Sequence, residues 1–168
     1  EFATKLTGRY IEIEMFTLNF REYLDMKAFF GKEIKENKVE EFNEYIRFGG
    51  FPKVLEFDDP NDKDTYIAEV IFQILEKDVV KHKKIRNRSV FDKVMTYVIN
   101  NFGATMSLSS IAEYFDKQEH ISIRTETINN YLQILENAKI IYKCSRFDVK
   151  SKKSLRGEQK YYLADLGI

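Results

Sequence analysis

The sequence has no tryptophan and very little cysteine, histidine or proline. Its 168 residues include one Cys, two His and two Pro. Because Cys144 has no second cysteine to pair with, an internal disulfide is excluded, which favours a reducing, cytoplasmic compartment. His82 and His120 lie far apart, without nearby cysteine or paired carboxylates, so we expect no metal site.

The sequence also lacks long apolar runs and a recognisable leader. No apolar stretch approaches the roughly 20 residues that a helix needs to cross a bilayer. The N-terminus has no signal-peptide pattern, so we expect no membrane partner. The first residues, Glu1 to Thr4, lack an initiator methionine, and we expect the sequence to be a fragment of a longer protein.

Common catalytic and nucleotide-binding motifs are missing as well. There is no Gly-x-x-x-x-Gly-Lys-Ser/Thr loop for phosphates and no Gly-x-Ser-x-Gly turn for a nucleophile. The many carboxylates between Glu33 and Asp64 are typical of a solvated helical face rather than of a catalytic pair. We therefore predict that this stretch of chain binds no cofactor and is not an enzyme by itself.

The residues that are present indicate a globular chain with unequal charge. Apolar residues make up 43% and aromatic residues 14% of the sequence, which favours a folded core. Residues 1–79 carry 11 Lys and Arg against 18 Asp and Glu, whereas residues 80–168 carry 16 against 9. The basic second half indicates an anionic partner. The alternative is that the two halves attract each other across a domain boundary.

Periodicity predicts a short strand and two helices before residue 53. Tyr10–Glu14 alternates with the period of a strand. One helix runs from Asn19, its N-cap, to Asp25. A second runs from Glu33 to Phe48 and has a strongly charged outer face. Its apolar residues are Val39, Phe42 and Ile46. Gly49–Pro52 ends it, because paired glycines accept positive φ and proline cannot continue a helix.

A longer helix and a basic linker complete the first half. Asp58–Asp62 is predicted as a loop, and the helix extends from Asp64 to Lys81. Its apolar stripe consists of Ile67, Val70, Ile71, Ile74 and Leu75. The segment Lys81–Arg88 holds five basic residues and is the predicted linker between domains.

Three helical patterns and two strands follow the linker. The helices are centred on Phe91–Phe102, with Gly103 as a left-handed cap, on Leu108–Phe115 and on Ile128–Leu135. Either Ser107 or Ser110 caps the second helix, the latter in a capping box with Glu113. The strands are Lys139–Cys144 and Lys160–Leu163. This order is that of a winged helix, in which the second and third helices form a helix-turn-helix.

We therefore predict a mainly α fold with a small β-hairpin. A helical N-terminal subdomain and its basic linker, residues 31–88, precede a winged helix-turn-helix domain over residues 89–168.

The third helix is the candidate reader of DNA bases. The periodicity that buries Ile128, Leu132 and Leu135 exposes polar residues near the start of this helix. The candidates are Arg124, Thr125, Thr127, Asn129 and Asn130. Arginine pairs with guanine edges, asparagine with adenine, and threonine with phosphate or a thymine methyl group. The alternative is an ordinary polar helix face.

The hairpin is the candidate phosphate contact. Residues 139–160 include eight basic and two acidic side chains. The tip carries Lys150, Lys152, Lys153 and Arg156. A basic tip that neutralises phosphates releases counterions, which gives affinity but little sequence information. A solvated basic loop is the alternative.

Six short stretches, in this order, resemble the C-terminal part of a large prokaryotic family of AAA-type ATPases. They are Leu6–Tyr10, Leu18–Tyr23, Gly49–Pro52, Asp78–Val80, Thr127–Leu132 and Tyr161–Asp165. In that family an ATPase module precedes a domain of unknown function that contains a winged helix. The resemblance covers nearly the whole chain and implies that residues 1–30 are the tail of the ATPase module.

The resemblance implies further partners outside this chain. ATP and Mg²⁺ would bind an upstream ATPase module, and Arg9 would be a candidate arginine finger for phosphoryl transfer. The family usually continues beyond the last strand into a nuclease-like tail. The predicted function is DNA binding that tethers or regulates the ATPase. The alternative is a protein–protein interaction or oligomerisation module, such as a homo-oligomer contact, without direct nucleic-acid contact.

Overall fold

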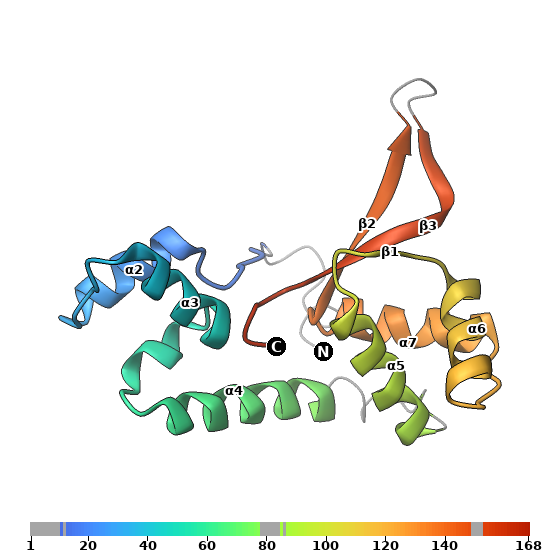
Figure 1. The fold of residues 1–168 in the computed structure, drawn as a ribbon, viewed down its shortest axis with the longest axis horizontal. Helices are drawn as coiled ribbons and strands as arrows, with labels where there is room; N and C mark the ends of the chain where they lie inside the picture. The colour runs from blue at the N-terminus through green and yellow to red at the C-terminus, as the bar shows by residue number, and fades with distance from the viewer. Residues whose placement is uncertain (1–10, 12, 78–84, 86, 149–152) are drawn as a thin grey trace.

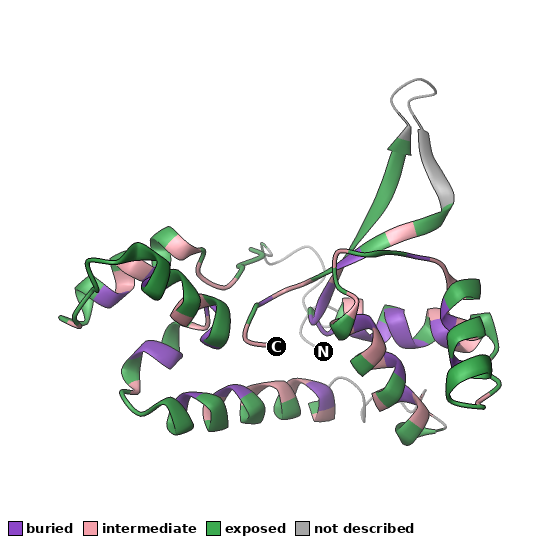
Figure 2. Cartoon of the chain, in the orientation of Figure 1, coloured by how far each residue is buried: buried purple, intermediate pink, exposed green. Residues whose placement is uncertain are grey.

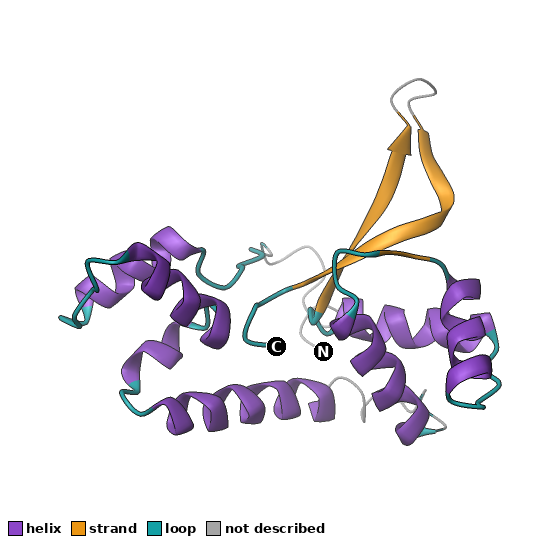
Figure 3. Cartoon of the chain, in the orientation of Figure 1, coloured by secondary structure: helices purple, strands orange, loops and turns teal. Residues whose placement is uncertain are grey.

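A computed structural model describes residues 11, 13–77, 85, 87–148 and 153–168 (Figure 1). Helices make up most of it, and a small three-stranded antiparallel sheet lies in the second half (Figure 3). The mainly α class predicted from the sequence is confirmed at this level. The finer assignment to a winged helix-turn-helix stays a prediction.

The described residues of the first half form three α-helices and a short 3₁₀ helix. They are α2 (Phe20–Phe29), α3 (Lys38–Phe48), η1 (Pro52–Glu56) and α4 (Pro60–Leu75). The α-helices begin after Asn19, Asn37 and Asp59, whose side chains accept hydrogen bonds from backbone N–H groups of the first turn. The Asn19 cap is therefore confirmed, and it forms a capping box with Glu22.

Several boundaries in the first half differ from the sequence prediction. α3 begins at Lys38 rather than Glu33, and α4 begins at Pro60, inside the predicted loop, because the cap side chains fix both starts. The described residues of the predicted strand, Ile11, Ile13 and Glu14, form no strand. No neighbouring strand in the described chain supplies the hydrogen bonds that this segment would need.

The apolar stripe predicted to be the buried face of α3 is exposed instead. Val39, Phe42 and Ile46 are 64%, 42% and 43% exposed, whereas Glu41 is fully buried. The inner face of α3 instead receives two lysines, Lys27 from α2 and Lys63 from α4. Ion pairing with these lysines, rather than apolar periodicity, decides which face of α3 is buried.

In the second half, the described residues form three helices and the sheet. Its elements are α5 (Arg88–Asn100), β1 (Thr105–Met106), α6 (Leu108–Gln118), α7 (Thr125–Asn137), β2 (Ile141–Asp148) and β3 (Lys153–Leu163). The cap of α6 is Ser107, in a capping box with Ser110, which decides between the two alternatives. Helix α5 ends at Asn100 with Asn101 as its C-cap, so Gly103 is not the cap.

The sheet order is β1-β3-β2, and both pairings are antiparallel. Both hairpin strands are longer than predicted, because their outer parts extend beyond the core as a ribbon in which apolar alternation is not needed (Figures 1 and 2). The two-residue strand β1 was not predicted at all, since it is too short to carry a period. It pairs Thr105 with Lys160 and Met106 with Gln159.

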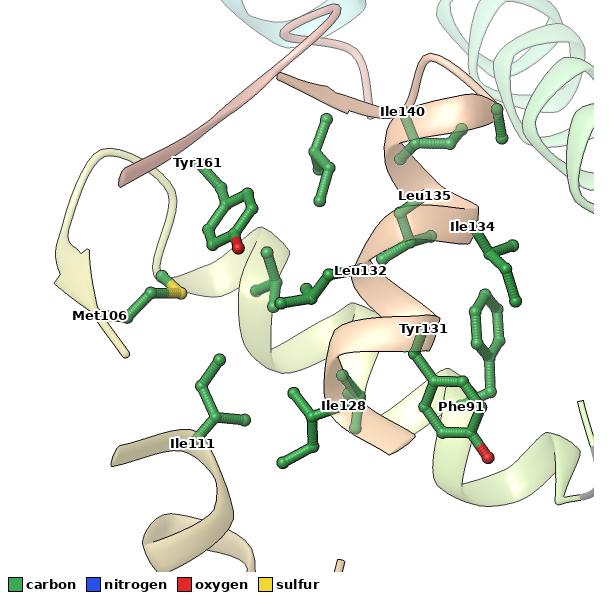
Figure 4. Close-up of a cluster of buried hydrophobic side chains, with 14 of the residues drawn as sticks. Phe91, Met106, Ile111, Ile128, Tyr131, Leu132, Ile134, Leu135, Ile140 and Tyr161 are labelled. Atoms are coloured by element: carbon green, nitrogen blue, oxygen red, sulfur yellow. The ribbon is translucent and has the colours of Figure 1, made fainter. Parts of the chain in front are cut away.

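The main core lies between α5, α6, α7 and the base of the sheet. Figure 4 shows Ile128, Leu132 and Leu135 of α7 in a cluster with Ile111 and Tyr161, and all five are at most 2% exposed. Leu75 at the end of α4 belongs to the same cluster. A smaller cluster in the first half contains Phe48, Val54 and Ile67.

A buried carboxylate joins the two halves. The backbone N–H of Gly50 donates to Asp165 Oδ2 at 2.8 Å, and that of Gly167 donates to Oδ1 at 2.8 Å. Nearby, the backbone N–H of Leu18 donates to the Gly50 carbonyl at 2.8 Å. We call these contacts the Asp165 clasp. They connect the end of α3 with the segment that follows β3.

Candidate nucleic-acid interface

Helix α7 is held in place along one side and exposed along the other. Ile128, Tyr131, Leu132, Ile134 and Leu135 are buried against α5, α6 and the sheet. Burial of such side chains is worth roughly 1.5–3 kcal/mol each relative to exposure. The helix is therefore a rigid support for the polar side chains on its other side.

The structure separates the five predicted base-contact residues into two groups. Arg124, Thr125 and Asn130 are exposed, with Arg124 as the N-cap residue of α7. Thr127 and Asn129 are half-buried, because their positions turn toward the flanks of the packed side. The first group is open to a ligand, and the second offers only part of its surface.

Sequence reasoning missed two further side chains on the exposed side of α7. Glu126 and Gln133 are exposed and lie near Asn130, since residues three and four apart share a helix face. The signal was present, because Gln133 follows Asn130 by three residues and precedes the buried pair Ile134 and Leu135. It was overlooked because a recognition helix usually contacts bases near its N-terminus, and Gln133 lies two turns further on.

The four predicted residues of the hairpin tip are only partly described. Lys150 and Lys152 lie outside the described residues. Lys153 and Arg156 belong to β3, but only their backbone is described. Their proposed contact with phosphates therefore stays a prediction.

The described part of the hairpin carries three further exposed cations, Lys143, Arg146 and Lys160. Lys143 lies opposite the buried Tyr161, whereas Lys160 lies opposite Cys144. Because adjacent strand residues point to opposite faces, Lys143 and Lys160 are on opposite sides of the ribbon. Arg146 and Lys160 both line a hollow of about 320 Å³ midway along the hairpin, together with Glu158. Positive charge is thus present on both faces.

Ion pairing distinguishes these cations from the others in the second half. Arg88 pairs with both Glu76 and Asp92, and Lys93 pairs with Glu119. Lys117 pairs with Glu113, and Lys139 pairs with Glu14. Within the described part of the chain, no ion pair is formed by Arg124, Lys143, Arg146 or Lys160. The described cations without an acidic partner in this half are therefore those at the start of α7 and on the hairpin.

One carboxyl group lies near this surface at the end of α7. Burial raises the pKa of Glu136 above its ordinary value, and the positive charge of Lys143 opposes this shift. Helix α7 contacts strand β2, so the end of α7 lies against the base of the hairpin.

Two other predicted features fall outside what the structure describes. Arg9, the candidate arginine finger, is outside the described residues. So are Lys81, Lys83, Lys84 and Arg86 of the basic linker, while Arg88 begins α5. Among the described residues, no group of His, Cys, Asp or Glu side chains is arranged to hold a metal ion.

Comparison with known proteins places the chain in a family. The sequence profile of a domain of unknown function, DUF8612, matches residues 39–168. The chain belongs to the DUF8612 family. The matched region of this DUF8612 chain crosses the predicted domain boundary near residue 88 and includes both α3 and the hairpin.

Two relatives show how much of a longer protein the DUF8612 chain represents. An uncharacterised protein of Haemophilus influenzae is 30% identical over 168 residues, which is 100% of this chain and 41% of that protein. An uncharacterised protein of Methanocaldococcus jannaschii is 34% identical over 157 residues, which is 90% of this chain and 35% of that protein. The chain spans less than half the length of either relative.

These comparisons do not test the predicted ATPase parentage, because neither relative's name states an activity. In the part of the chain that the structure describes, no helix has both the length and the apolar character needed to span a bilayer.

Proposed function

We propose that residues 89–168 form a winged helix-turn-helix domain that binds duplex DNA and tethers or regulates an attached ATPase. The observation that carries this proposal is the set of four unpaired cations at the start of α7 and on the hairpin. Cations that form no ion pair within the protein are available to neutralise phosphates. The order of α5, β1, α6, α7, β2 and β3 supports the winged-helix assignment.

The hairpin geometry favours insertion into a groove. A groove has a phosphate backbone along each side, so a ribbon that enters a groove approaches both backbones. Lys143 and Lys160, on opposite faces of the ribbon, would then each approach a different backbone. A ribbon lying flat on one backbone would use only one of these faces.

The test measures duplex binding by the complete 168-residue chain at several salt concentrations. Replacing both Arg146 and Lys160 with alanine should weaken binding to all sequences alike and lower the salt slope by about 1 for each phosphate that is no longer neutralised. The matched control is Lys93→Ala with Lys117→Ala, two exposed lysines that already have carboxylate partners. The control should bind like the unchanged chain.

The proposal fails if the unchanged chain shows no duplex binding at low salt. It also fails if the Arg146 and Lys160 variant binds as well as the control. Binding that does not fall with rising salt would contradict the role of phosphate contacts.

The resemblance to AAA-type ATPases supports the second part of the proposal. The relatives extend well beyond the matched region, which leaves more than half of each for another module. ATP and Mg²⁺ would bind there, and Arg9 would stabilise charge during phosphoryl transfer. ATP hydrolysis by a longer protein that includes this chain should fall with Arg9→Ala. Unchanged hydrolysis would remove the role of Arg9.

A second candidate function is oligomerisation, which the exposed face of α3 favours. Val39, Phe42 and Ile46 form an apolar stripe at helical spacing that stays 64%, 42% and 43% exposed, although the ring of Phe42 contacts that of Phe20. Such a stripe is an ordinary contact between two copies of a helix. Sedimentation of the chain should then show a dimer that Val39→Ser with Ile46→Ser dissociates. A monomer at all concentrations would exclude this function.

A further inference from the structure

The exposed side of α7 is a continuous row of side chains with hydrogen-bonding ends. Its members are Glu126, Asn130, Gln133 and Asn137, and all four are exposed. Their spacing of four, three and four residues keeps them within one narrow sector of a helix with 3.6 residues per turn. Three of the four are carboxamides. We call Asn130, Gln133 and Asn137 the amide row.

The polar ends of the amide row are free within the described chain. Elsewhere, Asn19, Asn37 and Asn87 use their side chains to cap helices. By contrast, no hydrogen bond in the described structure involves the side chains of Asn130, Gln133 or Asn137. Their donors and acceptors therefore face solvent on a helix whose other side is fixed in the core.

The amide row contains no positive charge. Helix α7 has neither Lys nor Arg between Thr125 and Asn137. The unpaired cations lie instead at its N-cap, Arg124, and on the hairpin. The cations would contact phosphates and the amide row would contact bases, a division of roles that is common in proteins that recognise a DNA sequence.

The chemistry of a carboxamide selects one base. Its NH₂ group donates to N7 of adenine while its oxygen accepts from N6, so Asn and Gln form paired hydrogen bonds with adenine in the major groove. Asn130 and Gln133 are about 4.5 Å apart along the helix axis, slightly more than the base-pair rise of about 3.4 Å. The two side chains are therefore spaced to reach neighbouring base pairs.

We infer that Asn130 and Gln133 are specificity-determining residues that read adjacent adenines in the major groove of duplex DNA. This inference rests on the proposed DNA-binding function and deepens it by naming the sequence feature that is recognised. The sequence alone predicted a base contact for Asn130 but not for Gln133, so the role of Gln133 is the new part of this inference.

The experiment selects duplexes from a randomised pool with the complete 168-residue chain and then measures affinity for the enriched sites. The enriched sites should contain adjacent A·T pairs. Asn130→Ala and Gln133→Ala should each weaken binding to such a site by roughly 10- to 100-fold, with little effect on unrelated duplexes. Gln133→Glu, which keeps the shape but removes the donor to N7, should lose the preference as well.

Two controls keep the result interpretable. Asn43→Ala replaces an exposed asparagine on α3 and should leave selection unchanged. Far-UV circular dichroism should show that the α7 variants remain folded, because the replaced side chains are exposed. Enrichment that is absent, or that survives both alanine substitutions while binding persists, overturns this inference alone. Absence of duplex binding by the unchanged chain overturns the proposed function and the inference with it.

Discussion

At the scale of single residues, the least expected feature is a buried group of opposite charges in the first half. Lys27 Nζ donates to both oxygens of Glu41, at 2.9 and 2.7 Å, and to Glu44 at 3.3 Å. Lys63 Nζ donates to Glu44 at 2.7 Å. Because Glu41 has no contact with solvent, its removal would leave the charge of Lys27 buried without its main partner.

Glu41→Ala should therefore be severely destabilising. A buried charge left without its partner typically costs about 3–5 kcal/mol, which urea unfolding would measure. Glu40→Ala, one residue away and exposed, should change the free energy of unfolding by less than about 0.5 kcal/mol. Equal effects of the two substitutions would show that the Lys27–Glu41 pair contributes nothing specific.

Glu44 makes the stability contributed by this buried charged group depend on pH. Burial acts to raise the pKa of Glu44, but hydrogen bonds and charge from Lys63, followed by Lys27, outweigh it, so the pKa lies below its ordinary value. The folded state therefore binds the Glu44 proton less tightly than the unfolded chain does. This contribution to stability is present above the ordinary glutamate pKa and is lost as pH falls through the lower, folded-state value.

Unfolding measured between about pH 2 and pH 7 should show this loss. Glu44→Gln should reduce the acid dependence of the unfolding free energy, whereas Glu40→Gln should leave it nearly unchanged. If the unfolding free energies of the two variants fell equally as the pH was lowered, the role of Glu44 would be contradicted.

At the scale of elements, the end of α3 depends on glycine for two reasons. Gly49 has φ +70°, which side chains other than glycine rarely adopt, and a Cβ there would lie 1.6 Å from Asp165 Oδ1. Gly31 has a similar φ of +67° but nothing within 4 Å of its Cβ position. Gly49 also has ψ −163°, and this combination of angles is essentially restricted to glycine. Its substitution therefore adds backbone strain as well as a clash with the Asp165 clasp.

Gly31→Ala should cost about 1–2 kcal/mol, the usual penalty of a left-handed conformation. Gly49→Ala should cost clearly more, because it also displaces Asp165 from the N–H groups of Gly50 and Gly167. Thermal unfolding of the two variants measures the difference. Similar midpoints would mean that the clasp adds nothing to the stability of the chain.

Elements with capping residues and a buried stripe were the ones that the sequence predicted best. Asn19 marked the start of α2, and the three helices of the second half were found from residues such as Phe91, Ile111 and Leu132, which are all buried. The buried face of α3 was mistaken because ion pairs override apolar periodicity there. In the candidate interface, exposure of Arg124, Thr125 and Asn130 could be predicted, whereas Gln133 was missed.

At the scale of the whole molecule, the two halves are less separate than their opposite charges indicated. The Asp165 clasp ties residues more than a hundred positions apart, and contacts of this kind leave no periodic signal in a sequence. Ile71, Ile74 and Leu75 of α4 also pack against the core of the second half. Helix α4 is therefore part of the first half in sequence, but its side chains pack in the cores of both halves.

This shared packing means that α4 should stabilise the fold around α7. Leu75, 5% exposed, contributes to the core that holds α7, whereas Phe72, on the same helix, is 61% exposed. Leu75→Ala should destabilise the chain by about 2–5 kcal/mol and should lower the hydrogen-exchange protection of α7 amides as much as that of α4 amides. Phe72→Ala should leave both nearly unchanged. If Leu75→Ala weakened protection only in α4, the two halves would unfold independently, and the predicted boundary near residue 88 would also be a boundary of cooperativity.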